Sequence, residues 1–368
     1  MPQRRFIAAP PVALVAPRRG SRPVRVPRLR GVLSLVAAAH SLALACQPAV
    51  QSAAHPTTAA NPSLASNSLT PGLRDGPHDV VINGVRLWYR VAGASAAGIP
   101  PVVFLHGGPG QGSYHFAALA GPYLERSLRL VYFDQRGSGR SERPWTRDYD
   151  MSTLVEDIEG LRRELGVDQL ALIGHSFGGT LALEYAARYP EHVSALVFVA
   201  GLWDAPLQGR YRCEQMKTLY RDSTDVAGAL GEGDNCDGFW KLPQARRGAI
   251  NNALMFPDSM VRRRLDSVTV ASGLRYGGEL DAALMKAGLL EYHFTAYQRL
   301  TMPVLVVAGR HDRAVVSEGL RELTRRLPNA RFVEYEHSGH FVYLDEPDRF
   351  AGDMTVFLTA ARKGQRER

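Results

Sequence analysis

A Gly-x-Ser-x-Gly sequence, in which x is any residue, constrains this 368-residue chain more than any other feature. An apolar run over 170–173 leads into Gly174-His175-Ser176-Phe177-Gly178, and a helical pattern follows over 180–189. A serine on a tight strand-to-helix turn holds its hydroxyl clear of the sheet, and small flanking residues let the two backbones come close. A serine in this setting is a nucleophile, so the chain should also contain its catalytic partners.

Two later predicted strands, over 303–309 and 330–335, are each followed by a candidate partner. Asp312 comes just after the first strand, at the carboxyl edge of the sheet, where parallel sheets usually carry their functional residues. His340 lies in the loop after the second strand. The order serine, aspartate, histidine along the chain favours Ser176 as nucleophile, His340 as general base and Asp312 as the group that orients the base.

Two other histidines, His311 and His337, compete for the role of base. His311 stands next to Asp312, where its side chain is expected to point away from the serine. His337 lies nearer the end of its strand, as an ordinary loop histidine would. His340 is therefore preferred.

A glycine-rich loop follows an earlier predicted strand over 101–105. Attack on a carbonyl creates an oxyanion that needs N–H donors already in place. One donor should be the amide of Phe177, and the other that of Gly107 or Gly108, since glycines let backbone N–H groups approach a substrate. A phosphate-binding loop is the alternative, but no Gly-Lys-Ser/Thr follows.

Two further sequence blocks resemble those of a known protein family. They are His106-Gly107-Gly108-Pro109-Gly110 and Asp134-Gln135-Arg136-Gly137-Ser138-Gly139-Arg140-Ser141. With the serine motif, they make the chain similar to alpha/beta hydrolases, and specifically to the prolyl aminopeptidase (proline iminopeptidase) branch. The resemblance covers 79–362 and is weak between 202 and 297. It implies an α/β fold with a mostly parallel eight-stranded sheet, helices on both faces and an inserted helical cap.

The resemblance implies a serine hydrolase that forms an acyl-enzyme and releases N-terminal proline or a small residue from short peptides. Phe177 stands where prolyl aminopeptidases often carry tryptophan, and esterases of the fold share the His-Ser-Phe-Gly-Gly form. An ester or lactone hydrolase is therefore an alternative, as is a non-catalytic binding protein on the same fold. No cofactor is expected, and no metal, since the histidines are scattered.

The domain organisation follows from where strands alternate with helices. Core parts are expected over 78–201 and 299–368, and a helical cap over 202–298, where short helical patterns replace strands. In prolyl aminopeptidases cap carboxylates hold the free amino group of the substrate. By position alone, the candidates here are Asp204, Glu214 and Glu291. Arg136 either lines the substrate pocket or forms a structural ion pair, and the ion pair is favoured.

The amino-terminal 46 residues resemble an export signal. They hold eight arginines and no acid, so they account for the whole net charge of +8, and no nucleic-acid partner is inferred. An apolar run over 31–45 ends at Cys46, which resembles the lipid-attachment cysteine of bacterial lipoproteins. Residues 47–77 are rich in Ala, Ser, Thr, Pro and Asn, as in a flexible tether. The expected location is the periplasm or a membrane surface to which lipid anchors the chain.

The other two cysteines, Cys213 and Cys236, both fall in the expected cap. An even pair in an exported protein is typical of a disulfide. Two buried free thiols are the alternative.

Overall fold

Strand residues alternate between two hydrophobic cores, one on each face of a central eight-stranded sheet. In strand β3 (Val102–Leu105), Val103 and Leu105 belong to one core, while Val102 and Phe104 belong to the other. Successive side chains of a strand point to opposite faces, so an uninterrupted apolar strand predicts cover on both sides.

The structure is a computed structural model that describes residues 71–94 and 99–366. The expected export segment 1–46, with Cys46, and residues 47–70 of the expected tether lie outside the described residues.

The sheet has the order β1-β2-β4-β3-β5-β6-β7-β8. Strands β1 and β2 form an antiparallel hairpin, β2 is antiparallel to β4, and all other neighbours are parallel. This confirms the mostly parallel eight-stranded sheet predicted above. Besides β3, the strands are β1 (Gly76–Ile82), β2 (Val85–Ala92), β4 (Leu130–Asp134), β5 (Leu170–His175), β6 (Val193–Val199), β7 (Val304–Gly309) and β8 (Ala330–Tyr335).

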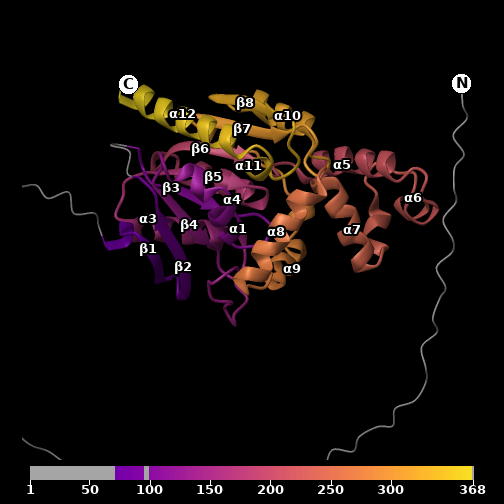
Figure 1. Cartoon of the computed structure of the whole chain (residues 1–368), viewed down its shortest axis with the longest axis horizontal. Coiled ribbons are helices and arrows are strands. Elements are labelled where there is room, and N and C mark those ends of the chain that lie inside the picture. The colour runs from indigo at the N-terminus through magenta and orange to yellow at the C-terminus, as the bar shows by residue number, and fades with distance from the viewer. Residues whose placement is uncertain (1–70, 95–98, 367–368) are drawn as a thin grey trace, which may run out of the picture. The chain divides into compact units, whose positions relative to one another are not determined.

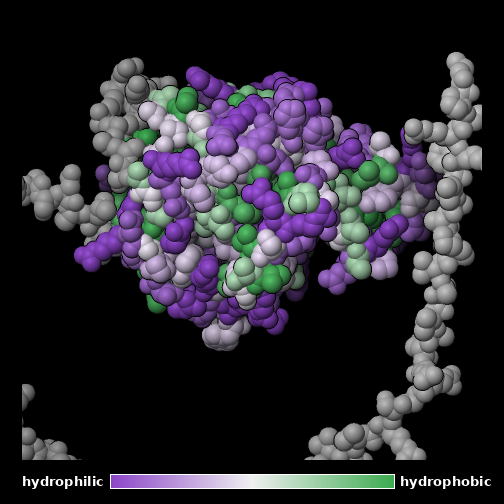
Figure 2. Space-filling model, viewed as in Figure 1, coloured by the Kyte–Doolittle hydropathy of each residue, from purple (hydrophilic) through white to green (hydrophobic). Residues whose placement is uncertain are grey.

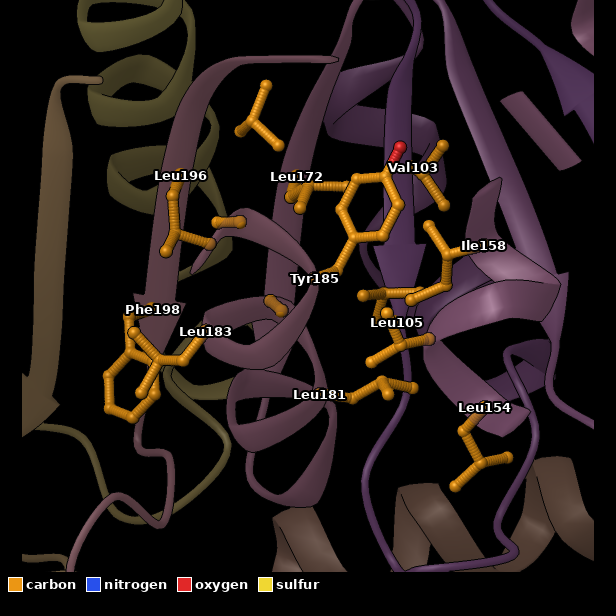
Figure 3. Close-up of a cluster of buried hydrophobic side chains, with 14 of the residues drawn as sticks. Val103, Leu105, Leu154, Ile158, Leu172, Leu181, Leu183, Tyr185, Leu196 and Phe198 are labelled. Atoms are coloured by element: carbon orange, nitrogen blue, oxygen red, sulfur yellow. The ribbon is translucent and has the colours of Figure 1, made fainter. Parts of the chain in front are cut away.

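Helices cover both faces of the sheet (Figure 1). One face is covered by α3 (Met151–Leu165), α4 (Phe177–Arg188) and α10 (Ser317–Arg326). The other is covered by α1 (Tyr114–Leu119), α2 (Gly121–Leu124), α11 (Val342–Asp345) and α12 (Pro347–Arg366). Figure 3 shows the first core, where Leu154 and Ile158 of α3 and Leu181 of α4 lie near strand side chains such as Leu105.

The expected boundary of the tether at residue 77 is too late in the chain. Residues Pro71–Leu73 form a 3-10 turn and β1 begins at Gly76. Tyr89 donates a hydrogen bond to the carbonyl of Gly72 (3.2 Å), and the buried Arg129 donates to the carbonyl of Leu73. These contacts tie residues 71–77 to the folded core.

The segment between β6 and β7 is a helical cap. It contains α5 (Ala205–Leu219), α6 (Thr224–Leu230), α7 (Gln244–Met255), α8 (Ser259–Ser272) and α9 (Gly278–Lys286), with 3-10 turns η3 (Asp237–Lys241), η4 (Leu289–Glu291) and η5 (Tyr297–Arg299). The part that carries α6 and α7 projects from the sheet (Figure 1), and its surface mixes apolar and hydrophilic residues (Figure 2).

The cap has a small core of its own. A disulfide joins Cys213 of α5 to Cys236, with Cα atoms 5.5 Å apart, and both cysteines are buried beside Phe239 and Val226. The bond closes a loop across the projecting part, which a small core alone stabilises weakly. Among the described residues, no helix is both long and apolar enough to cross a bilayer.

Arg136 forms the structural ion pair that the sequence analysis favoured, and it does not line the substrate pocket, which was the alternative. Its guanidinium forms a two-pronged ion pair with Asp157 of α3, in which both N···O distances are 2.6 Å and both side chains are almost fully buried. Asn83 of the β1–β2 turn donates to the same carboxylate at 2.9 Å. The pair therefore joins the turn after β4 to α3 and to the hairpin.

Replacing Arg136 by methionine should destabilise the protein by about 3–5 kcal/mol, because the buried Asp157 carboxylate would lose its partner. Urea unfolding followed by circular dichroism measures this. Arg188→Met is the matched control. Arg188 forms a partly exposed ion pair with Glu156, which lies next to Asp157 in α3, so its loss should cost less than about 1 kcal/mol. Equal losses in the two variants would contradict the structural role.

Candidate active site

Ser176 lies on the turn between β5 and α4, in the backbone geometry that its motif predicts. Its φ of 55° and ψ of −123° are strained values for a residue other than glycine. Its side chain is partly exposed, although both elements that flank it are buried. The amide of Phe177 begins α4, where the first N–H groups of a helix have no intrahelical acceptor. That amide is available to an oxyanion.

His340 and Asp312 are in direct contact. Nδ1 of His340 lies 2.7 Å from Oδ2 of Asp312, and both residues are buried. The other carboxylate oxygen accepts the backbone N–H groups of Ala314 and Val315, each at 2.9 Å. The aspartate is thus held by three donors, and it orients the imidazole so that Nε2 is on the far side of the ring from the carboxylate.

The two competing histidines are placed elsewhere. His311 and His337 are both exposed. The backbone amide of His311 donates to the carbonyl of Ser338 at 2.9 Å, and that of His337 to the carboxylate of Glu346 at 3.0 Å. Neither imidazole lines the cavity described next.

A cavity of about 470 Å³ lies between the carboxyl edge of the sheet and the cap. Ser176 and His340 both line it, as do Gly108 and Phe177 of the expected oxyanion site. The cap contributes lining residues from α5, α7, α9 and η4. A cavity of this size holds a small molecule or a short peptide.

The loop after β3 approaches the serine so closely that one of its positions cannot carry a side chain. A Cβ placed on Gly107 would lie 2.8 Å from Cβ of Ser176. Gly108 has a φ of +121° and precedes a cis proline. Since β3 lies beside β5, the two turns meet at the same edge of the sheet. This edge brings Gly107 and Gly108 together with Phe177 and Ser176.

The block that begins with Asp134 supports this loop. The buried carboxylate of Asp134 accepts the backbone N–H and the hydroxyl of Ser113, both at 2.6 Å, and the backbone N–H of Arg140 at 2.9 Å. A Cβ on Gly139 would lie 2.2 Å from this carboxylate. The block is therefore structural, since it packs a tight turn against the oxyanion loop.

His175, the residue before the nucleophile, steadies the loop that carries His340. Its Nε2 lies 2.9 Å from the carbonyl oxygen of His340, and the two rings are 4.8 Å apart. Burial, aided by the nearby imidazole of His340, lowers the pKa of His175 well below its ordinary value. The ring is thus neutral at physiological pH.

The three cap acids expected to hold a substrate amine do not line the cavity, and those assignments are wrong. Asp204 caps α5 by accepting the N–H of Leu207 at 2.9 Å and faces His293 at 3.3 Å. Glu214 and Glu291 are exposed. Their positions in the sequence did not reveal which side of each short helix faces the sheet.

The cavity holds other charged cap residues that the sequence analysis missed. Asp281 of α9 and Arg212 of α5 both line it. Burial raises the pKa of Asp281. The closeness of α9 to the active-site loop follows from a hydrogen bond of 2.7 Å, from the N–H of Gly277 to the carbonyl of Gly110. In the sequence, this approach of α9 to the active-site loop is signalled by the glycine pair at 277–278, because glycines let two backbones come close.

Within the described residues, no cluster of three or more histidine, cysteine, aspartate or glutamate side chains could bind a metal ion.

Asp345 holds the loop of His340 and should make stability depend on pH. It accepts the N–H of Gly339 at 2.8 Å, and burial, with smaller effects of Asp258 and Glu346, raises its pKa to about 6. The folded state favours the neutral form of the Asp345 carboxyl group. The stability that this group contributes is therefore fully present below its unfolded pKa of about 4, and it is lost as the pH rises through 6.

Asp345→Asn should therefore raise the melting temperature at about pH 8, and by less at about pH 5, since asparagine keeps the acceptor without the charge. Thermal unfolding at both pH values measures this. Asp234→Asn is the control, because Asp234 is exposed in a cap loop. A gain of equal size at both pH values would contradict the assignment.

Comparison with known proteins agrees with this architecture. The family described as alpha/beta hydrolase fold matches residues 100–347. Proline iminopeptidase PfmaB of Pestalotiopsis fici is 43% identical over 284 residues, which cover 73% of this chain and 94% of that protein. The proline iminopeptidase of Saccharolobus solfataricus is 26% identical over 292 residues, which cover 75% and 90%.

A solved structure agrees as well. The proline iminopeptidase-related protein of Thermus thermophilus superposes with a TM-score of 0.65 at 26% identity, over 79% of this chain and 99% of that chain. The chain therefore belongs to the alpha/beta hydrolase family, in its proline iminopeptidase-like branch, and is a hydrolase.

Proposed function

We propose that this hydrolase is an aminopeptidase that releases N-terminal proline, or another small residue, from short peptides through an acyl-enzyme. The observation that carries the mechanism is the 2.7 Å contact between His340 and Asp312, made beside a cavity that Ser176 and His340 both line. The proline iminopeptidases to which the chain is similar support the choice of substrate.

In this mechanism the hydroxyl oxygen of Ser176 attacks the carbonyl carbon of the N-terminal residue. Nε2 of His340 takes the hydroxyl proton and passes it to the leaving amine. Asp312 keeps the imidazole in the tautomer with its proton on Nδ1 and stabilises the imidazolium. The amides of Phe177 and of Gly107 or Gly108 bind the oxyanion. Water then releases the acyl group by the same proton transfers.

Asp281 is the acid best placed to receive the substrate's ammonium group. It lines the cavity from α9, while the hydrogen bond between Gly277 and Gly110 holds the start of that helix against the oxyanion loop. Asp281 is half-buried, and its pKa is raised by burial, so an incoming cation would favour its charged form.

We also propose that the protein works in an oxidising compartment after export. The Cys213–Cys236 disulfide supports this, because disulfides persist mainly outside reducing compartments. The expected signal and Cys46 would account for the export and for a lipid tether.

Ser176→Ala should lower kcat for proline naphthylamide by at least about a thousandfold, since the acyl-enzyme cannot form. Ser152→Ala, at an exposed position on α3, is the control and should keep wild-type turnover. Labelling by a fluorophosphonate probe should be lost only in the first variant. An unlabelled wild-type protein would instead indicate a non-catalytic binding protein, and hydrolysis of nitrophenyl esters without hydrolysis of proline naphthylamide would indicate an esterase.

Asp281→Asn should lower kcat/KM for proline naphthylamide by about 10- to 100-fold, because a charge-assisted hydrogen bond to the ammonium is lost. The loss should appear mainly in KM and should be far smaller for a nitrophenyl ester that has no amine. Glu279→Gln, an exposed change on the same helix, is the matched control. Equal losses for the amine-bearing substrate and the ester would contradict an amine site.

A further inference from the structure

A guanidinium group in the active-site cavity has no acidic partner among the residues that the structure describes. Arg212 projects from α5, is partly accessible and lines the cavity together with Ser176 and His340. Its Nη2 donates to the side-chain oxygen of Asn251 in α7, and its guanidinium lies 5.0 Å from the centre of the Phe239 ring. These contacts hold the cation in place without neutralising it.

Three other buried or half-buried arginines are paired. Arg136, Arg129 and Arg162 each form an ion pair with a carboxylate, namely those of Asp157, Asp75 and Glu159. Arg212, in contrast, makes no ion pair of 4.0 Å or less with any residue that the structure describes. Its Nε, like that of Arg129, is buried without a hydrogen-bond acceptor in the described part of the chain.

The acid whose charge acts on Arg212 is Asp312, which already has its donors. Burial lowers the pKa of Arg212 to about 10, and the charge of Asp312 partly opposes this. Asp312 accepts from His340, Ala314 and Val315, and no hydrogen bond joins it to Arg212. The guanidinium remains charged at physiological pH, with donors that no carboxylate of the described chain satisfies.

A carboxylate is the group that best satisfies a half-buried arginine of this kind, because its two oxygens match the planar set of guanidinium donors. We propose that Arg212 binds the carboxylate of the substrate, so that the preferred substrates are dipeptides with a free amino terminus and a free carboxyl terminus. This rests on the proposed function and names its substrate class. Asp281 and Arg212 line the cavity from two different cap helices. A zwitterionic dipeptide carries an ammonium group for Asp281 and a carboxylate for Arg212.

The test compares prolylalanine with its C-terminal amide, prolylalaninamide, which differ only in the carboxylate. The wild-type enzyme should have a kcat/KM for the acid at least about tenfold higher than for the amide. In Arg212→Met this ratio should fall to about one. Arg210→Met removes an exposed arginine of the same helix and should keep the wild-type ratio.

A second variant guards against a misfolded cap. The side-chain oxygen of Asn251 accepts a hydrogen bond from Arg212. Asn251→Asp keeps the size of this side chain and gives Arg212 a permanent carboxylate partner at the same position. The ratio of acid to amide should fall in this variant as well, although the arginine is still present. Melting temperatures of both variants check that the cap remains folded.

Two results would overturn the proposal. Equal kcat/KM values for acid and amide in the wild-type enzyme would show that no carboxylate site exists. A loss of equal size for acid and amide in Arg212→Met would show that Arg212 acts only by positioning Asp312.

Failure of the proposed function is recognised separately. It would leave proline naphthylamide and both peptides uncleaved by the wild-type enzyme. The carboxylate site is then judged by calorimetric titration of Ser176→Ala with the two peptides. Binding of the acid at least about tenfold tighter than the amide would support the site, and equal binding would overturn it.

Discussion

The backbones of β3, β5 and α4 approach one another so closely that side chains are excluded where they meet. A Cβ on Gly178 would lie 2.0 Å from the carbonyl oxygen of Leu105, and one on Gly174 would lie 2.5 Å from that of Gly178. This contact forces the turn at Ser176 into its strained geometry and brings the loop of Gly107 beside it. The rest of the site is arranged around this meeting point.

The cap is part of the catalytic framework as well as its cover. The carbonyl groups of Leu254 and Met255, at the end of α7, accept the N–H groups of Arg313 and His340, each at 3.0 Å. The loops that carry Asp312 and His340 are thus hydrogen-bonded to the same cap helix. A disturbance of the cap is therefore expected to reach the proton-transfer groups as well as the substrate pocket.

Charges are distributed differently in the framework and in the cavity. Arg136 and Asp157 neutralise each other in the framework, where a buried unpaired charge would be costly. In the cavity, Asp281 has no ion-pair partner among the described residues, and Arg212 has none either. Unpaired groups of opposite sign are suited to a ligand that carries both charges, whereas an apolar ester would leave both unsatisfied.

The sequence by itself determined the sheet and the order of the catalytic candidates, because strand periodicity, glycine turns and the serine motif are local signals. It predicted the four strands that carry the site, β3, β5, β7 and β8. Only the tertiary structure decided which cap residues face the cavity. Short, partly exposed helices have weak periodicity, so the sequence offered Glu214 as a candidate by position alone. Packing leaves Glu214 exposed and brings Arg212 of the same helix to the cavity. The sequence favoured an ion pair for Arg136, and the tertiary structure decided its partner, Asp157 of α3, because the two residues are distant in sequence.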